Sequence, residues 1–156
     1  MKWFAPIVIL SRIGEMEERV TPDVFSKEKR SEIMARIRSK DTRWEIAFRR
    51  KLHRRGLRYR LYYGPYKIDI AFPKARIAVF LDSCWWHYCP THREIPKTNA
   101  EFWLRKFERT SIRDRRVTRT LRNAGWTVLR LWSHDYVPRP DAAATKVERR
   151  VRQRKA

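Results

Sequence analysis

The sequence predicts an α/β domain in which a small mixed sheet is flanked by helices. Three observations support this class. A chain of 156 residues has the size of a single domain, and its 42% hydrophobic and 13% aromatic residues suffice for a packed core. Apolar residues recur at helical spacing near both ends of the chain and as short β-rich runs in its middle. The expected order of elements is α-α-β-β-β-α-β-α, with no internal repeat.

Two helices are expected first. Residues 27–40 carry an amphipathic pattern, and Ser26 can cap it. The second helix opens with a capping-box pattern, in which Thr42 is followed three residues later by Glu45, and it ends at Gly56.

The rest of the chain alternates strand and helix signals. Turn residues such as Gly-Pro and Pro-Lys separate three β-rich runs, and a loop rich in Cys, His, Pro and Asn follows them over 83–99. A long amphipathic helix, one more strand and a basic helix complete the domain. The expected strands are 57–63, 68–72, 77–81 and 126–132, and the expected helices are 100–124 and 140–154.

The charge is large and unevenly distributed. There are 38 Lys and Arg residues against 17 Asp and Glu, a formal net charge of +21. Residues 27–60 carry a net +10 and residues 102–156 a net +11, whereas 1–26 carry −1 and 61–101 carry +1. A domain this basic repels itself without an anionic partner, which favours nucleic acid over a membrane surface and disfavours an enzyme of neutral small molecules. No segment reaches the ~18 apolar residues of a membrane span.

Three acids and a histidine are the first candidates for chemistry. Glu45 lies in the first turn of the second helix. Asp69 lies inside an apolar run, and Asp82 ends the next run. On neighbouring strands their carboxyl groups could converge, and a helix, a hairpin and two acids at this spacing form the skeleton of restriction-endonuclease-like nucleases, where Mg²⁺ activates water. His87 can accept a proton near neutral pH, whereas the usual nuclease lysine is replaced by Cys84. Alternatively, Asp69 is an edge or turn acid and Asp82 caps a loop.

A second constellation has the residue types and the spacing of a metal site. Cys84, Cys89 and His92 form the pattern C-x4-C-x2-H, and a tetrahedral Zn²⁺ would need a fourth ligand from elsewhere, for which His134 is the candidate. Four protein ligands would leave no open position, so such a zinc would be structural. The alternative is two free thiols in a loop.

Two adjacent tryptophans, Trp85 and Trp86, separate Cys84 from His87. In a DNA-binding protein such flat side chains can wedge between base pairs and unstack them. Alternatively, one of them faces the core and the other covers the metal loop.

Several strings of residues, in order, resemble the very short patch repair (Vsr) DNA mismatch endonucleases, over about Lys29 to Tyr136. They are RSKDT (38–42), LDSCWWHYCPTH (81–92), PKTN (96–99), FWLRK (102–106), RD (113–114) and GWTVL (125–129). The resemblance implies a restriction-endonuclease-like fold with a structural zinc. It also implies Mg²⁺-dependent nicking of one strand 5′ to the thymine of a T:G mismatch, the lesion left by deaminated 5-methylcytosine.

The resemblance also implies roles for individual residues. The metal-binding Asp falls on Asp69, a backbone carbonyl that contacts the metal on Leu81, the general base on His87 and the helix Glu on Glu45. Asp82 stands where members carry Asp or His beside the metal.

The family's DNA wedge falls on Trp85, Trp86 and Met34. Lys106 and Arg113 lie in matched strings of the basic long helix and are candidate DNA contacts. Members carry a zinc-binding Cys where this chain has His134, which implies a Cys₂His₂ site. Trp85 and Tyr88 are bulkier than the Phe and Gly common in the family.

The expected organisation is an N-terminal extension (1–26), a Vsr-like endonuclease domain (27–137) and a basic C-terminal helix (138–156). The expected partner is double-stranded DNA with a mismatch, bound by a monomer that could contact other mismatch-repair proteins. The expected location is the nucleoid in a prokaryotic cytoplasm, with no membrane association. Two alternatives stay open: nicking at other mismatches or DNA structures, and a non-catalytic, zinc-stabilised DNA-binding module.

Overall fold

The computed structural model describes residues 26–154 except 37 and 39. Its centre is a four-stranded sheet of order β1-β2-β3-β4. The first three strands are antiparallel neighbours, and β3 pairs in parallel with β4. The strands are β1 (Arg60–Tyr63), β2 (Ile68–Phe72), β3 (Ile77–Asp82) and β4 (Thr127–Trp132). A mixed sheet with flanking helices confirms the predicted fold class.

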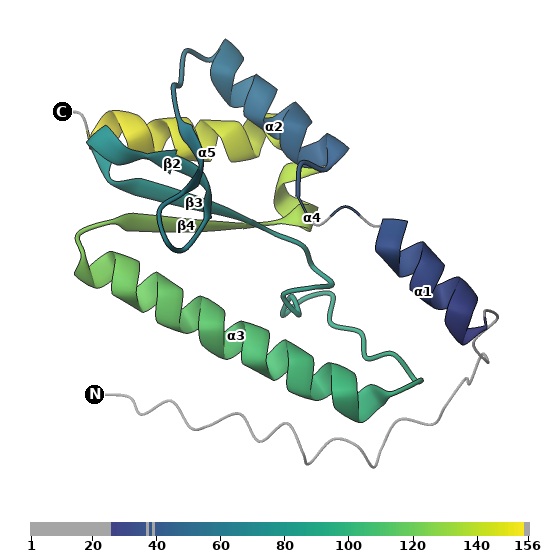
Figure 1. Cartoon of the computed structure of the whole chain (residues 1–156). Coiled ribbons are helices and arrows are strands. Elements are labelled where there is room, and N and C mark those ends of the chain that lie inside the picture. The colour runs from purple at the N-terminus through teal and green to yellow at the C-terminus, as the bar shows by residue number, and fades with distance from the viewer. Residues whose placement is uncertain (1–25, 37, 39, 155–156) are drawn as a thin grey trace.

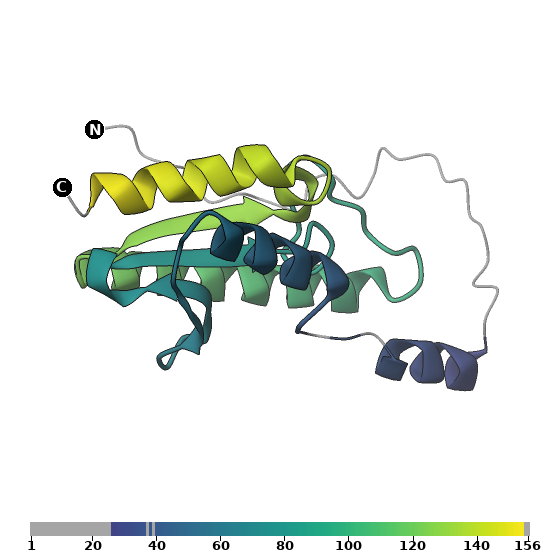
Figure 2. The same cartoon turned by 90° about the horizontal axis from the view of Figure 1, so that it is seen from above.

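Helices cover both faces of this sheet (Figures 1 and 2). Helices α2 (Arg43–Arg54) and α5 (Pro140–Gln153) lie over one face, and α3 (Ala100–Asn123) lies along the other. Because β3 and β4 are parallel, the chain must cross back between them, and α3 makes that crossing. The remaining elements are α1 (Lys27–Arg36), the 3₁₀ turn η2 (Pro73–Ala75) and the short helix α4 (Ser133–Tyr136).

Each face of the sheet has its own apolar cluster, because successive side chains of a strand point to opposite faces. Val79 of β3 packs with Phe48 of α2 and Val147 of α5 on one face. On the other face Phe80 packs with Leu121 of α3. The expected basic C-terminal helix is thus α5, and its apolar side is part of the larger core. Ion pairs from Lys51 and Arg55 to Asp141 join α5 to α2.

Most observed bounds lie within one residue of the predicted ones, and the larger differences concern the first helix, the first strand and one short helix. The first helix is described to Arg36, and residues 37 and 39 of its expected span lie outside the described residues. Strand β1 begins at Arg60 rather than at residue 57, because the N–H of Leu57 bonds the carbonyl of Leu52 and so still belongs to the end of α2. Helix α4 was not predicted. The expected N-terminal extension lies outside the described residues except for Ser26.

Within the described part of the chain, no helix combines the length and the apolar character that crossing a membrane requires.

Candidate active site and metal cluster

Asp69 lies near the start of β2, where it is the one strand residue that is not fully buried. Its Oδ2 accepts a hydrogen bond from the backbone N–H of Leu81 on β3, at 2.9 Å. Burial, with smaller contributions from the neighbouring carboxylates of Glu45 and Asp82, raises the pKa of Asp69 to about 6 against the opposing effect of that N–H. A buried carboxyl with a raised pKa and acidic neighbours is a group that a cation would stabilise.

Glu45 reaches this region from the first turn of α2. The predicted capping box is present: Thr42 Oγ1 accepts from the N–H of Glu45 at 3.3 Å, and Glu45 Oε2 accepts from the N–H of Thr42 at 3.2 Å. The cap therefore orients the Glu45 carboxylate, whose negative charge contributes to the raised pKa of Asp69.

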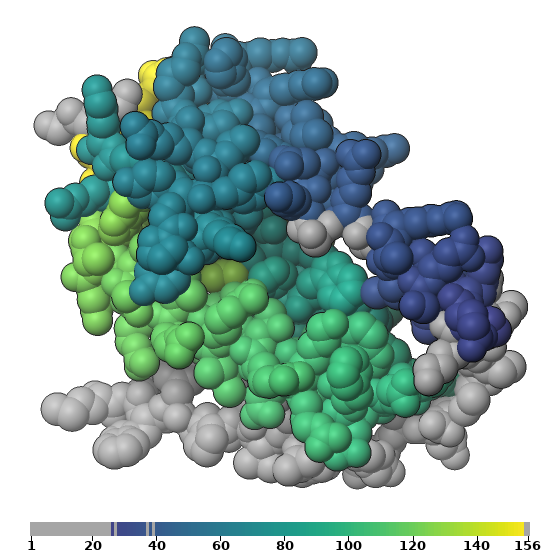
Figure 3. Space-filling model, viewed as in Figure 1, coloured from purple at the N-terminus to yellow at the C-terminus, as the bar shows by residue number. Residues whose placement is uncertain are grey.

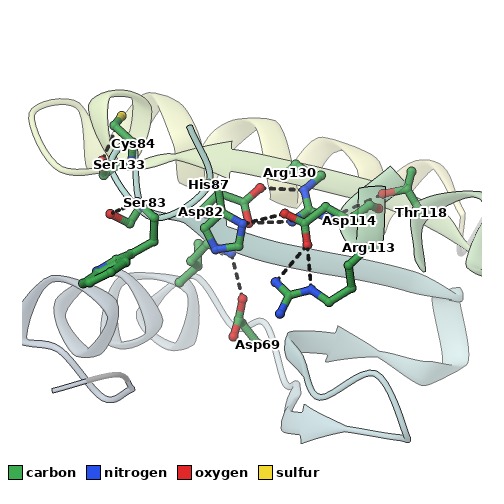
Figure 4. A network of polar contacts seen from close by, with 12 residues as sticks. Asp69, Asp82, Ser83, Cys84, His87, Arg113, Asp114, Thr118, Arg130 and Ser133 are labelled. Atoms are coloured by element: carbon green, nitrogen blue, oxygen red, sulfur yellow. Dashed lines mark hydrogen bonds and ion pairs between the residues drawn. The ribbon is translucent and has the colours of Figure 1, made fainter. Parts of the chain in front are cut away.

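His87 follows β3 in the loop and is held by an acid from α3. Its Nδ1 lies 2.6 Å from Oδ2 of Asp114 and 3.5 Å from Oδ1 of Asp82. Burial opposes ionisation of Asp114, but the hydrogen bond from His87 and the charge of Arg130 outweigh it, so the pKa of Asp114 is lowered. Because a carboxylate only accepts hydrogen bonds, Nδ1 of the neutral ring carries the proton and Nε2 keeps a free electron pair. Figure 4 shows the imidazole between Asp114 and Asp69.

Asp82, at the end of β3, is 2% exposed and forms a two-pronged ion pair. Nε and Nη2 of Arg130 lie 2.6 and 2.7 Å from its two carboxylate oxygens (Figure 4). The same guanidinium lies 3.1 Å from Oδ2 of Asp114. Arg130 therefore neutralises both acids that face His87, and both oxygens of Asp82 are occupied by this contact.

The carboxylates and the imidazole converge at one end of the sheet, where α2, β2, β3 and α3 come together. The space-filling view shows a hollow between α3 and the β1–β2 hairpin on this side of the molecule (Figure 3). Such a group of acids with one oriented imidazole can bind a cation and accept a proton from water.

The two cysteines and two of the histidines form a second group, which could hold a metal ion. The ligand atoms of Cys84, Cys89, His92 and His134 all lie within 4.8 Å of one another. Nδ1 of His134 lies 3.1 Å from Sγ of Cys84 and 3.6 Å from Sγ of Cys89, and Nδ1 of His92 lies 3.8 Å from Sγ of Cys89. The predicted fourth residue, His134, comes from the short helix α4, fifty positions along the chain from Cys84.

Hydrogen bonds hold both sulfur atoms of this cluster, and those at Cys89 favour its thiolate form. Ser133 Oγ donates to Sγ of Cys84 at 3.0 Å and accepts from its backbone N–H at 3.1 Å. Burial opposes ionisation of the Cys89 thiol, but hydrogen bonds from the backbone of Thr91 and His92 lower its pKa below the ordinary value. The thiolate is the form that binds metals.

Trp85 and Trp86 pack on α3, and both stay partly exposed. The ring of Trp85 lies edge-on to those of Trp103 and Phe107, each with centroids 5.9 Å apart, and Trp86 lies 6.1 Å from Trp103. The result is a contiguous aromatic surface between the metal cluster and His87.

The other three candidate DNA contacts differ in their surroundings. Met34 is 37% exposed on α1. The ammonium of Lys106 lies over the ring of Trp103, 4.8 Å from its centroid. Arg113 pairs with Asp114, with Nη2 and Oδ1 3.0 Å apart, so its guanidinium already has a partner in the protein.

Two residues of the site were missed. Asp114 lay within a matched string, but nothing in its spacing pointed to His87. Arg130 did carry a signal, because it is the single charged residue in the strand 127–132. A charge in a largely apolar strand needs a buried partner.

Comparison with known proteins decides which family has this arrangement. The family model of the DNA mismatch endonuclease Vsr matches residues 22–93. The Type II nicking enzyme V.NaeI of Lentzea aerocolonigenes is 42% identical over 126 residues, which cover 76% of this chain and 75% of the relative. The chain belongs to the Vsr family. The DNA mismatch endonuclease Vsr of Escherichia coli K12 is 34% identical over 113 residues, covering 70% of this chain and 72% of that protein. V.NmeDIP, a Type II nicking enzyme of Neisseria meningitidis serogroup C, is 40% identical over 140 residues, covering 86% and 90%.

As a Vsr-family protein the chain is a DNA endonuclease. Membership confirms the predicted enzyme class and the predicted resemblance, and it identifies DNA as the substrate.

Proposed function

We propose that this Vsr-family enzyme nicks one strand of duplex DNA at a T:G mismatch, 5′ to the thymine, with Mg²⁺ as its catalytic cation. The observation that carries the proposal is that Asp69 and the oriented imidazole of His87 lie together at one end of the sheet in a member of this family, with Glu45 contributing its charge from α2. DNA binding alone requires neither a buried carboxyl with a raised pKa nor an oriented imidazole, so the arrangement favours a nuclease over a non-catalytic binding module.

The donor set around Asp69 fits a hard cation. Of the two carboxylate oxygens of Asp69, Oδ2 accepts a hydrogen bond from a described residue and Oδ1 does not. Oδ1 is therefore available to a cation. Oxygen ligands are those that Mg²⁺ prefers, and the backbone carbonyl of Leu81 on the adjacent strand would be the second protein ligand. When bound there, Mg²⁺ would neutralise charge on the phosphate and acidify a water molecule.

His87 would act as the general base. Nε2 would take the proton from the attacking water while a P–O bond forms to that water and the bond to the leaving oxygen breaks. Asp114 holds Nδ1–H, which fixes the tautomer and stabilises the positive ring after proton transfer, and Arg130 keeps Asp114 in place. Asp82 would contribute through its contact with Arg130 and its proximity to the ring.

The cysteine–histidine cluster would hold a structural Zn²⁺. Zinc–ligand bonds of about 2.0–2.3 Å at tetrahedral angles separate the ligand atoms by about 3.3–3.8 Å, close to the observed separations of 3.1, 3.6 and 3.8 Å. Four protein ligands leave no position for a substrate. The ion would tie the loop after β3 to α4 and so position the intervening segment that carries Trp85, Trp86 and His87.

The DNA contacts follow from charge and from the aromatic surface. The two basic segments, residues 27–60 and 102–156, would supply the contacts to the phosphate backbone of the duplex. Trp85, Trp86 and Met34 would wedge between base pairs at the mismatch, and Lys106 beside Trp103 would contact the DNA next to them. Arg113 would do so only by sharing or leaving Asp114. We further propose that the enzyme acts as a monomer.

A second specificity has a specific observation in its favour. The ring of Tyr88 stacks on Phe107, with centroids 4.8 Å apart and planes at 14°, and Trp85 lies against the same residue. These bulky side chains occupy positions where family members commonly have Gly and Phe, so the wedge could accommodate other mismatches.

A nicking assay decides between the two. Strand-labelled duplexes with each of the mismatches and a matched control, in several sequence contexts, are incubated with the enzyme with and without Mg²⁺. We expect nicks in the thymine strand of T:G duplexes only when Mg²⁺ is present. Equal nicking of other mismatches would replace the T:G specificity, and nicking without any divalent cation would contradict the role of Mg²⁺.

The metal cluster has its own test. His134→Ala should reduce the zinc content measured by metal analysis and lower the melting temperature, whereas His53→Ala, which removes a histidine outside the cluster, should change neither. Full zinc content in the His134 variant would contradict a Cys₂His₂ site.

A further inference from the structure

An open groove of about 520 Å³ lies between α3 and β4, and its lining beyond His87, Asp114 and Arg130 has no part in the chemistry above. It begins at His87 and Asp114 and continues along α3 as far as Asn123. Its other wall includes Arg130 and Trp132 of the edge strand β4. The groove therefore leads away from the candidate general base along the outer edge of the sheet.

Three arginines line this groove on one face of α3. Arg115, Arg119 and Arg122 follow one another at intervals of four and three residues, which places them on successive turns of the same helical face. All three are exposed. Within the described part of the chain no ion pair or side-chain hydrogen bond joins any of them to a partner, in contrast to Arg113 and Arg130.

Among the described residues the groove has no acid free to neutralise these charges, and Asp114 is the only acidic one that lines it. Its carboxylate already contacts His87, Arg113 and Arg130. Thr118 and Asn123, which lie between and beside the arginines, add neutral hydrogen-bonding groups. The lining thus combines unneutralised guanidinium groups with neutral polar groups, the side chains that bind phosphate oxygens in protein–DNA interfaces.

We propose that this groove binds the phosphate backbone of one strand of the substrate duplex, on one side of the scissile phosphate. The proposal rests on the proposed function, because His87 marks the position of the scissile phosphate. From Arg115 to Arg122 the helix advances about 10 Å, at about 1.5 Å per residue. One strand of B-DNA carries a phosphate about every 3.4 Å of axis, so the three arginines would serve about three consecutive phosphates. The groove then gives the enzyme its register along one flank without reading sequence.

Salt dependence of binding tests the proposal. The triple variant Arg115→Gln, Arg119→Gln, Arg122→Gln keeps helix-favouring residues at exposed positions, so it should fold like the wild type, as circular dichroism and a thermal melt will show. Binding to an uncleaved T:G duplex is measured without divalent cations over a range of salt. The slope of log K against log salt should become shallower by about 2 to 3, because each phosphate contact contributes about 0.9.

A charge-matched control separates local contact from net charge. The variant Lys146→Gln, Arg149→Gln, Arg150→Gln removes the same three charges from α5, which covers the opposite face of the sheet. Because these charges lie outside the groove, its salt slope should become shallower by less than that of the α3 variant. Equal slopes for the two triple variants, or no change in the α3 variant, would overturn the proposal.

Duplex length gives the second readout. Duplexes that carry a central T:G pair are shortened stepwise from one end or from the other. For the wild type, loss of one particular flank should weaken binding to the level of the α3 triple variant, which should itself be insensitive to that loss. If the α3 triple variant lost affinity equally when either end of the duplex was shortened, the groove would not bind one side of the duplex. None of these measurements requires nicking, so a failure of the proposed T:G activity would be seen separately.

Discussion

The two faces of the sheet differ in how much apolar core and how many charged groups they carry. The face under α2 and α5 carries fifteen buried residues, whereas the apolar cluster under α3 has six. Beyond that smaller cluster, the α3 face continues as a polar network in which Asp82, Arg130, Asp114 and His87 contact one another. One face is closed to solvent, whereas the other ends in ionisable groups of which His87, Asp114 and Arg130 are partly exposed.

The difference shows how stability and chemistry are separated in this small domain. Buried apolar area is the main favourable contribution to folding, and most of it lies under α2 and α5. The charged groups of the α3 face are costly to bury, and each is balanced by a partner of opposite charge or by a hydrogen bond. Substitutions on the closed face should therefore change stability, and substitutions in the polar network should change the reaction.

The largest expected effect is on the reaction. His87→Gln should lower the single-turnover nicking rate by about 10²–10⁴-fold, the usual contribution of a general base, with DNA affinity and melting temperature close to wild type. His53→Gln on α2 is the matched control and should nick normally. If His87→Gln nicked at the wild-type rate, His87 would not be the base.

The next expected effect is on both stability and the nicking rate. Arg130→Leu should lower the free energy of unfolding by about 3–5 kcal/mol, because it leaves Asp82 buried and unpaired. It should also slow nicking where the variant is still folded, because Asp114 loses a partner. Leu52→Ala on the closed face should cost a similar 2–5 kcal/mol or so but leave the nicking rate unchanged. Denaturant unfolding measures the stability of each variant, and single-turnover assays measure its nicking rate. A normal nicking rate for Arg130→Leu would contradict the claim that the polar network supports the reaction.

A smaller effect concerns pH. The pKa of Asp69 is raised to about 6, so below that pH the carboxyl is mostly protonated and a cation must displace the proton. At limiting Mg²⁺ the nicking rate should rise with pH through about 6, and one pH unit below the pKa it should be about tenfold lower than at high pH. Saturating Mg²⁺ should move the midpoint of this rise to lower pH. Without a cation, the raised pKa makes stability decrease as pH rises from about 4 to 6, and Asp69→Asn should remove that trend. A midpoint independent of Mg²⁺ would contradict this account.

Most of the fold could be predicted from local patterns. The capping box at Thr42 and the glycine that ends α2 behave as expected, since Gly56 has a φ value of +78°, and Gly125 ends α3 in the same way with +79°. The second strand was predicted at its observed bounds because an apolar run lies between two turns. Helix α4 was missed because four residues are too few to show a helical period.

The site could be predicted only in part. The spacing of Cys84, Cys89 and His92 carries a local signal, and His134 was inferred as their fourth partner. The contacts of His87 with Asp114 and of Asp82 with Arg130 join residues 27 and 48 positions apart. Such pairs depend on how α3 crosses the sheet, which no local pattern encodes.

The central claim is that Asp69 supplies the cation site for strand cleavage, and one measurement tests it most directly. Single-turnover nicking of a T:G duplex in Mg²⁺ is compared for wild type and Asp69→Asn, with the affinity of both for the same duplex measured in parallel. Asn keeps the shape of Asp69 and its hydrogen bond from Leu81 but loses the charge. We predict that nicking is abolished while affinity stays close to wild type. Persistent Mg²⁺-dependent nicking by Asp69→Asn would contradict the claim.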